Sequence, residues 1–554
     1  MRLTRRSVTA GLATALLATT VGAGAPKPVR ARPNILLIVA DDVGYTDLGS
    51  YGSEIPTPNL DRLAANGVRF SDFHTGMTCS PTRAMLLSGV DHHRSGLGNM
   101  AEDLAPNQKG RPGYEGYLNF QVAALPEVLK ANGYRTFLAG KWHLGMTAET
   151  GPKARGFDQS FAMLQGGAGH FADMVPLVGP GKAKYRDGDD IVETLPSDFY
   201  STRYFTDKLL GYLGAGSVEE RSKPFFAYLA FTAPHWPIQA PDEDLRRFAG
   251  QYEDGYDALL ERRLASAKRL GLARSGDEGA ERAPWAKPWS ELSQTERRIE
   301  ARKMQAFAAM VAEIDRQVGR VLDYLEATGQ ADNTIIMFMS DNGYEGHDLR
   351  HDFPEAAEQS DRFDNRLEQI GRAGSYVWMG PGWARASSAP LRLFKGFPTE
   401  GGTRVPFIVS FPGLRRKGLV AERGHVMDVM PTLLELAAIR APNDRFEGRP
   451  VLEMDGLSMA PYLMGRRAHI HGPSEPSAQE LFGKRAVRVG QWKALNIREP
   501  YGAGRWQLFD LSRDLAERND LAKRYPTRLR AMIDQWDAWS RRNNVILPDQ
   551  VSGY

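Results

Sequence analysis

Five short runs of apolar residues stand out along the chain, and each ends abruptly in polar residues. They span residues 34–40, 135–139, 225–231, 334–339 and 405–411. Continuous apolar runs of this length are typical of parallel strands that are buried on both faces. Helical patterns lie between them, a long one over 299–325 and shorter ones over 60–65 and 429–436. Strands that alternate with helices predict an α/β fold with helices on both faces of the sheet.

The last hundred residues have a different pattern. Short alternating runs at 486–489, 492–495 and 506–509 precede a helical pattern over 526–539, which predicts a small antiparallel sheet with one packed helix. We therefore predict a main domain over 32–455 and a smaller C-terminal α+β domain over 456–554. Within the main domain, the charge-rich segment from about 242 to 300 predicts a helical excursion at the surface.

The N-terminus has the features of an export signal. Arg2, Arg5 and Arg6 precede an apolar stretch over 11–24 that is short for a bilayer span, and small residues follow. The Arg5-Arg6 pair resembles a twin-arginine signal, which directs folded proteins to the twin-arginine export machinery. Residues 1–25 are thus a predicted signal peptide, and the mature protein is expected to be periplasmic or secreted. An uncleaved basic tail is the alternative.

Composition narrows the function classes. The chain has 554 residues, of which 42% are hydrophobic and 25% charged, enough for a large core and unlike a disordered chain. The net charge of +3 falls to zero when the three arginines of residues 1–25 are removed (3 − 3 = 0), so nothing points to nucleic acid. No later apolar run is long enough for a membrane span. The single cysteine, Cys79, excludes an intrachain disulfide and a Cys-rich zinc site.

Polar residues with catalytic potential follow four of the five apolar runs. In chain order they are Asp41, Asp42, Lys141, His143, His235, Asp341 and Asn342. Ligands of open α/β sheets bind at the carboxyl ends of the strands. A single Asp or His at such a place is more often a helix cap, a turn residue or the edge of a core, but the whole set predicts a site.

The acidic members of this set suit a metal ion. Asp41, Asp42, Asp341 and Asn342 offer only oxygen ligands, which favours Ca²⁺, or Mg²⁺, over zinc. Adjacent carboxylates repel each other unless a divalent ion lies between them. Solvated or capping acids are the alternative.

Cys79 lies in Thr78-Cys-Ser-Pro-Thr-Arg83. Pro81 can start a helix, which would leave Cys79 near the helix N-terminus and Arg83 one turn on, facing the same site. An anion bound there would meet free backbone N–H groups and a guanidinium. The alternative for a lone cysteine is a small buried core residue.

These residues also carry a resemblance to a known family. The segment Cys79-Ser-Pro-Thr-Arg83 resembles the sulfatase signature C-x-P-x-R, and residues 133–143 resemble the second sulfatase signature. The likeness extends from about residue 32 to 521 and is strongest to bacterial arylsulfatases of the Pseudomonas type, for example over 233–237, 339–343 and 401–406. The resemblance implies an alkaline phosphatase-like fold, with a large mixed, mostly parallel sheet sandwiched by helices.

The resemblance also implies an activity. A sulfatase hydrolyses sulfate monoesters, here above all aryl sulfates, to an alcohol and inorganic sulfate. By family analogy, a formylglycine-generating enzyme or an equivalent maturase oxidises Cys79 to formylglycine. The hydrated aldehyde is the nucleophile and becomes transiently sulfated.

The analogy also assigns roles to individual residues. One Ca²⁺ would be held by Asp41, Asp42, Asp341 and Asn342 together with the modified Cys79. Arg83 would hold the hydrate, Lys141 and Lys395 the sulfate group. His143 would stand beside the hydrate and His235 would face the leaving group.

Three other functions stay open at this point. A phosphonate monoester hydrolase or phosphodiesterase of the same superfamily could use the same metal and nucleophile. A Ca²⁺-dependent protein that binds sulfated glycans would have an unmodified Cys79 or an incomplete set of site residues. A cysteine hydrolase using Cys79 and His143 would leave the acid cluster without a role.

Overall fold

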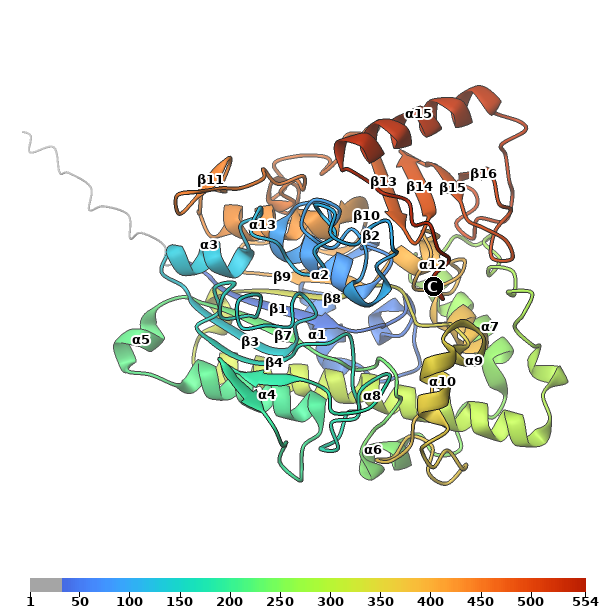
Figure 1. The fold of residues 1–554 in the computed structure, drawn as a ribbon, viewed down its shortest axis with the longest axis horizontal. Helices are drawn as coiled ribbons and strands as arrows, with labels where there is room; N and C mark the ends of the chain where they lie inside the picture. Colours follow the sequence, from blue (N-terminus) through green and yellow to red (C-terminus); the bar gives the residue numbers. More distant parts are fainter. Residues whose placement is uncertain (1–31) are drawn as a thin grey trace, which may run out of the picture. The chain divides into compact units, whose positions relative to one another are not determined.

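The computed structural model describes residues 32–554, and a ten-stranded mixed sheet is its main feature (Figure 1). The strand order is β10-β2-β9-β8-β1-β7-β3-β4-β5-β6. The bounds are β1 Asn34–Ala40, β2 Val68–His74, β3 Arg135–Lys141, β4 Gln159–Met163, β5 Tyr185–Asp187, β6 Asp190–Val192, β7 Phe225–Ala230, β8 Thr334–Ser340, β9 Phe407–Ser410 and β10 Gly418–His425. The central strands β8, β1, β7, β3 and β4 are parallel. The predicted fold class, a mostly parallel α/β sheet, is confirmed.

One strand direction differs from the prediction. β9 was expected to be parallel, but it runs antiparallel to both β8 and β2. The chain leaves β8 at its carboxyl end and passes through short helices only, α9 Leu349–Asp352, α10 Pro354–Ser360, α11 Pro381–Ser387 and α12 Glu400–Thr403. It then enters β9 from the same end of the sheet. An apolar run reports burial and not direction, which is why the sequence could not reveal this reversal.

Helices cover both faces of the sheet. Leu36 and Ile38 of β1 face a core built with α1, α4 and α8, whereas Ile35, Leu37 and Val39 face a core built with α2, α3 and α13. This alternation follows from the two-residue period of a strand. The helices span α1 Pro58–Asn66, α2 Cys79–Ser88, α3 Leu125–Ala131, α4 Ser201–Gly214, α5 Val218–Ser222, α8 Gln294–Ala327, α13 Val429–Leu436 and α14 Ala460–Leu463.

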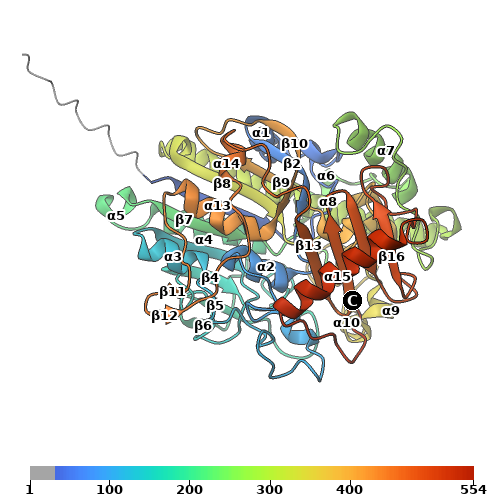
Figure 2. The same cartoon turned by 90° about the horizontal axis from the view of Figure 1, so that it is seen from above.

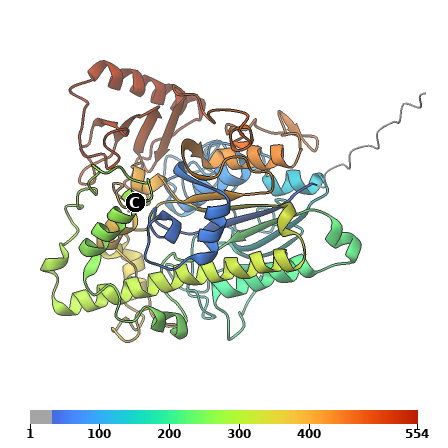
Figure 3. The same cartoon turned by 180° about the vertical axis from the view of Figure 1, so that it is seen from behind.

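The long helix α8 runs beneath one face of the sheet (Figure 3). Its first turn is fixed by a reciprocal pair of hydrogen bonds. Glu296 N donates to the Ser293 hydroxyl at 3.2 Å, and Ser293 N donates to the Glu296 carboxylate at 2.7 Å. Such a capping box satisfies two amides that a helix start leaves free, so the helix begins five residues before the predicted 299.

The charge-rich excursion is partly buried rather than wholly at the surface. It contains α6 Asp242–Arg247 and α7 Gly255–Arg269. Arg263 of α7 has no exposed side-chain surface and forms ion pairs with Asp47 and Glu54. The charge pattern of this segment predicts solvent exposure, but Arg263 pairs with acids that lie 216 and 209 residues away in sequence.

A separate four-stranded antiparallel sheet follows near the C-terminus (Figures 1 and 2). It comprises β13 Pro476–Leu481, β14 Lys484–Val489, β15 Trp492–Asn496 and β16 Trp506–Asp510, with α15 Pro526–Arg542 packed on one face and a small hairpin, β11 Arg445–Phe446 and β12 Arg449–Pro450, before it. The alternating pattern did not reveal β13, whose sequence is largely polar. Residues 32–554 form one compact unit, and the boundary at 455 stays a prediction.

Two further predictions concern membranes and export. Across residues 32–554, no helix is long and apolar enough to cross a bilayer. The predicted signal peptide, residues 1–25, lies outside the described residues.

Candidate active site

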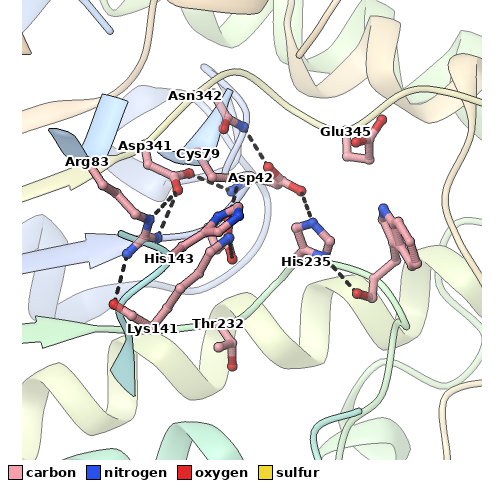
Figure 4. A network of polar contacts seen from close by, with 12 residues as sticks. Asp42, Cys79, Arg83, Lys141, His143, Thr232, His235, Asp341, Asn342 and Glu345 are labelled. Atoms are coloured by element: carbon pink, nitrogen blue, oxygen red, sulfur yellow. Dashed lines mark hydrogen bonds and ion pairs between the residues drawn. The ribbon is translucent and has the colours of Figure 1, made fainter. Parts of the chain in front are cut away.

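The structure brings the predicted site residues together at the carboxyl ends of the central strands (Figure 4). Asp41 and Asp42 directly follow β1, Asp341 and Asn342 directly follow β8, and Lys141 is the last residue of β3. His143 lies two residues after β3, and His235 lies five residues after β7. Lys395 comes from the irregular segment between α11 and α12. All of these side chains are buried.

Four potential metal ligands converge at one point. One ligand atom each from Asp41, Asp42, Cys79 and Asp341 lies within 4.8 Å of all the others. Asp42 adopts a positive φ of 74°, a backbone conformation that residues other than glycine seldom adopt. The consecutive acids thereby both reach the cluster, although side chains alternate in a strand.

Asn342 supports a cation at this point. Its amide nitrogen donates to a carboxylate oxygen of Asp42 at 2.5 Å. Its buried Oδ1 has no hydrogen-bond partner among the described residues, and a buried acceptor without a partner is rare. Burial and the neighbouring carboxylates of Asp41, Glu345 and Asp341 raise the pKa of Asp42 to about 8, against the opposite effect of Lys395. A cation bound here would give the Asn342 Oδ1 a partner and would stabilise the ionised form of Asp42. These oxygens therefore fit a divalent ion.

Cys79 begins helix α2, and Arg83 lies one turn further on, as predicted. The Arg83 guanidinium donates twice to Asp341, at 2.8 and 3.0 Å, and once to the Tyr228 hydroxyl at 3.3 Å. The Cys79 thiol lies 3.3 Å from Asp41. Burial, Asp341 and Asp41 raise the pKa of the thiol well above its ordinary value, so an unmodified Cys79 would be a poor thiolate nucleophile. This weakens the cysteine hydrolase alternative.

Two lysines flank the carboxylates. Lys141 Nζ lies 2.7 Å from Asp41, while Lys395 Nζ lies 3.0 Å from Asp42 and 3.4 Å from Glu345. Burial alone would lower their pKa values, but Asp41 and Asp42 respectively raise them. Both ammonium groups are therefore charged and available to hold an anion.

The two histidines have different partners. His143 Nε2 lies 2.9 Å from Glu102, and the buried Nδ1 has no partner within residues 32–554. His235 Nδ1 lies 2.6 Å from the Trp236 carbonyl oxygen and must donate to it. His235 Nε2 then points toward Asp42 at 3.7 Å (Figure 4). Burial, Lys395 and Lys141 lower the pKa of His235 well below its ordinary value.

Sequence reasoning missed several residues of this site. Glu102, Tyr228 and Glu345 contact His143, Arg83 and Lys395 respectively. Two glycines also matter: a Cβ at Gly166 would lie 2.9 Å from the His143 ring, and one at Gly167 would lie 3.1 Å from the His235 ring. The adjacent glycines in the sequence were a signal that other groups approach the backbone closely there. No local sequence pattern marks Glu102, Tyr228 or Glu345.

The family model for sulfatases matches residues 33–439, and the chain therefore belongs to the sulfatase family. It is a sulfuric ester hydrolase, and this family generally uses a formylglycine and a divalent metal. The chain is 39% identical over 459 residues to the arylsulfatase of Klebsiella aerogenes, covering 81% of this chain and 97% of that protein. It is 44% identical over 534 residues to an uncharacterised sulfatase of Schizosaccharomyces pombe, covering 93% and 94%.

Solved structures have the same fold. The crystal structure of Ps i-CgsB superposes with a TM-score of 0.66 at 26% identity, over 94% of this chain and 95% of that one. The same protein in complex with k-i-k-neocarrahexaose gives a TM-score of 0.65. These likenesses confirm the predicted sulfatase fold and leave the organic part of the substrate open.

Proposed function

We propose that this sulfatase acts on aryl sulfates, with Cys79 converted to formylglycine and one Ca²⁺ in the carboxylate cluster. The observation that carries this is the convergence of Cys79, Arg83, the oxygen ligands, both lysines and both histidines at one buried site. The similarity to the Klebsiella aerogenes arylsulfatase supports the aryl preference.

The residues that would hold the cation are Asp41, Asp42, Asp341 and Asn342. When bound, a cation at this place balances the charge of the sulfate group and increases the acidity of a nearby hydroxyl. The Asn342 Oδ1 without a partner and the raised pKa of Asp42 support the assignment. Oxygen ligands alone favour a hard ion, and Ca²⁺ suits an irregular set of this kind.

Cys79 is the position of the nucleophile. A hydrated formylglycine supplies the oxygen that attacks sulfur, and its second hydroxyl later permits the release of inorganic sulfate. Arg83 lies one turn further along α2, where its guanidinium, fixed by Asp341 and Tyr228, can orient the group at position 79.

Lys141 and Lys395 bind the sulfate oxygens. Lys141 is paired with Asp41 and Lys395 with Asp42, so the two ammonium groups are held at different carboxylates of the cluster. Fixed positive charges in a buried site stabilise the charge that develops on these oxygens as the ester bond breaks.

The departing alcohol oxygen needs a proton. His235 and Lys395 both lie beside Asp42, and we place the leaving group on this side of the site. His235 donates from Nε2 only when it is protonated, since its Nδ1 proton is engaged by the Trp236 carbonyl. His235 is neutral in the free site because burial, Lys395 and Lys141 lower its pKa, whereas Lys395 is protonated there because Asp42 raises its pKa despite burial. Lys395 therefore gives up the proton that His235 passes to the departing oxygen. We therefore assign leaving-group protonation to His235 with Lys395 as the adjacent proton source.

His143 acts in the second half of the reaction. Its Nε2 is held by Glu102, which leaves the unpartnered Nδ1 to accept a proton at position 79. Removal of that proton allows sulfate to leave. The carboxylate of Glu102 would stabilise the imidazolium that forms.

Two measurements on the active protein test this function. Mass spectrometry of the peptide that contains Cys79 should show formylglycine, and 4-nitrophenyl sulfate should be hydrolysed faster than the phosphonate monoester 4-nitrophenyl phenylphosphonate or the diester bis(4-nitrophenyl) phosphate. A higher rate on phosphonate esters would replace the aryl sulfate assignment with the phosphonate monoester hydrolase alternative. Only free thiol at Cys79 in fully active protein would refute the nucleophile.

Cys79 would be modified before the chain folds, and the folded enzyme would then be exported. A maturase would act on the Cys79 segment before α2 is buried, because all ten residues of that helix are inaccessible in the folded chain. The twin-arginine signal over residues 1–25 would then carry the folded enzyme to the periplasm or beyond. Replacing Arg5 and Arg6 by lysine should leave the enzyme in the cytosol.

A further inference from the structure

The last nine residues of the sequence, 546–554, return from α15 to the edge of the active site. Ile546 N donates to the Tyr114 hydroxyl at 2.7 Å, and the Gln108 and Asn107 side chains donate to the Ile546 and Leu547 carbonyls at 2.7 and 2.8 Å. Figures 1 and 2 show the end of the chain next to α9 and α10. This segment is therefore docked by specific hydrogen bonds.

The side chain of Tyr554 is packed in an aromatic environment. Its ring stacks on Phe482 with centroids 4.9 Å apart and planes at 6°, and it meets Phe353 and His347 edge-on at 4.7 and 5.2 Å. Tyr554 remains partly exposed, whereas Phe482 is buried. The ring therefore lies at a boundary between the protein interior and solvent.

The residues around this ring adjoin three parts of the active site. Tyr554 packs against a buried apolar cluster of Met77, Met100, Leu481 and Phe482, which we call the tail cluster. Met77 is two residues before Cys79, and Met100 is two residues before Glu102, the partner of His143. Two members of the tail cluster thus lie on the chain segments that carry Cys79 and Glu102.

The same ring also borders Lys395. A Cβ at Gly396, the next residue, would lie 3.0 Å from the Tyr554 ring, and Gly396 N donates to the Met77 carbonyl at 2.8 Å. Burial raises the pKa of Tyr554 well above its ordinary value, while the positive charge of Lys395 acts in the opposite direction. Tyr554 therefore packs against the residue that follows Lys395 in the chain.

We propose that Tyr554 is a specificity-determining residue whose ring forms one wall of the subsite for the organic group of the ester. This inference rests on the proposed aryl sulfatase function. The charged groups of the site hold the sulfate end, so the organic end must extend past the residues that border them. A partly exposed aromatic ring supported by a buried apolar cluster would stack on an aryl group and favour it over a small alkyl group.

The test compares an aryl substrate with an ion that has no organic group. In Tyr554→Ala, KM for 4-nitrophenyl sulfate should rise about fivefold to tenfold, the range expected for one aromatic contact. The inhibition constant of inorganic sulfate should stay within about twofold, because sulfate does not reach this wall. Tyr554→Phe keeps the ring and should keep the wild-type KM.

Matched controls separate the possible failures. Tyr525→Ala removes a tyrosine that packs on Trp492 of the four-stranded sheet, and should change neither constant. Tyr554→Leu, which retains apolar volume, replaces the alanine variant if that variant does not fold, and should also raise KM. Equal weakening of substrate and inorganic sulfate, an unchanged KM, or a raised KM in Tyr554→Phe would overturn the inference. A wild-type enzyme without sulfatase activity would instead refute the proposed function.

Discussion

Two buried clusters of charged residues in this protein look alike in composition but differ in their pairing. One is the active site. The other, which we call the interface cluster, lies between the large sheet and the four-stranded sheet and contains Asp72, His74, Glu400, Arg404, Arg488, Lys493 and Glu517. Each cluster includes acids close enough to share a metal ion. Proximity of ligand atoms therefore does not distinguish them.

In the interface cluster each acid has a cationic partner. Asp72 lies 2.9 and 2.7 Å from Arg404 and Arg488, and Lys493 lies 2.7 and 2.9 Å from Glu400 and Glu517. Despite burial, Arg404 and Arg488 hold the pKa of Asp72 well below its usual range. Three acids face three permanent cations, so an added divalent ion would create an excess of positive charge.

The active site has a surplus of acid instead. Four carboxylates, Asp41, Asp42, Asp341 and Glu345, face three cations, Arg83, Lys141 and Lys395. Burial and its acidic neighbours raise the pKa of Asp42 to about 8. Incomplete pairing, rather than clustering, thus indicates where a buried set of acids takes a cation and a substrate.

The largest expected effect comes from the nucleophile. Cys79→Ala should lower kcat for 4-nitrophenyl sulfate by roughly 10⁴-fold or more, because no other group nearby can take over covalent catalysis. Thermal unfolding should change little, since the thiol contributes only a small buried volume. Residual activity within about tenfold of the wild type would show that position 79 is not the nucleophile.

The second prediction breaks each cluster with the same substitution. Asp341→Asn should lose bound calcium in metal analysis and lower kcat/KM by roughly a thousandfold. Asp72→Asn in the interface cluster should keep metal and kcat but lower the free energy of unfolding by about 3–5 kcal/mol. The substitution leaves Arg488 without an acid and removes one of the two acids that pair with Arg404. Loss of metal in both variants, or in neither, would invalidate the comparison.

The third prediction separates the two histidines. His235→Ala should slow esters of weakly acidic alcohols far more than esters of acidic phenols, by roughly 10²-fold to 10⁴-fold at the weakly acidic end. His143→Ala should slow all esters to a similar turnover and show a burst of released alcohol, because its step no longer contains the alcohol. A leaving-group series with pre-steady-state kinetics measures both. Equal sensitivity to leaving-group acidity in the two variants would contradict the assigned roles.

Much of the fold and site could be predicted because the relevant signals are local. The run 34–40 predicts β1 with its observed ends. Pro81 predicts the start of a helix near Cys79, and α2 begins two residues before Pro81, at Cys79 itself. Glu345 and Glu102 could not be predicted, because their partners Lys395 and His143 lie 50 and 41 residues away in irregular segments. The pairing that distinguishes the two clusters also arises from such distant contacts, so composition alone could not tell them apart.

The smallest expected effect concerns a third buried contact, where His93 lies 2.9 Å from Asp91 and 3.1 Å from Glu480 of β13. Burial lowers the pKa of His93, but the hydrogen bonds to Asp91 and Glu480 outweigh it and raise the pKa to about 9. The unfolded chain has a value of about 6.5. Protonated His93 therefore stabilises the fold fully below pH 6.5, and this contribution disappears as the pH rises to about 9. A pKa that rises from about 6.5 to about 9 on folding corresponds to about 3 kcal/mol in the free energy of unfolding.

Denaturant unfolding at pH 6 and pH 9.5 should show that His93→Gln loses most of this pH dependence, whereas the exposed His351→Gln keeps it. An unchanged pH dependence in His93→Gln would show that this contact is neutral and does not strengthen the attachment of the four-stranded sheet.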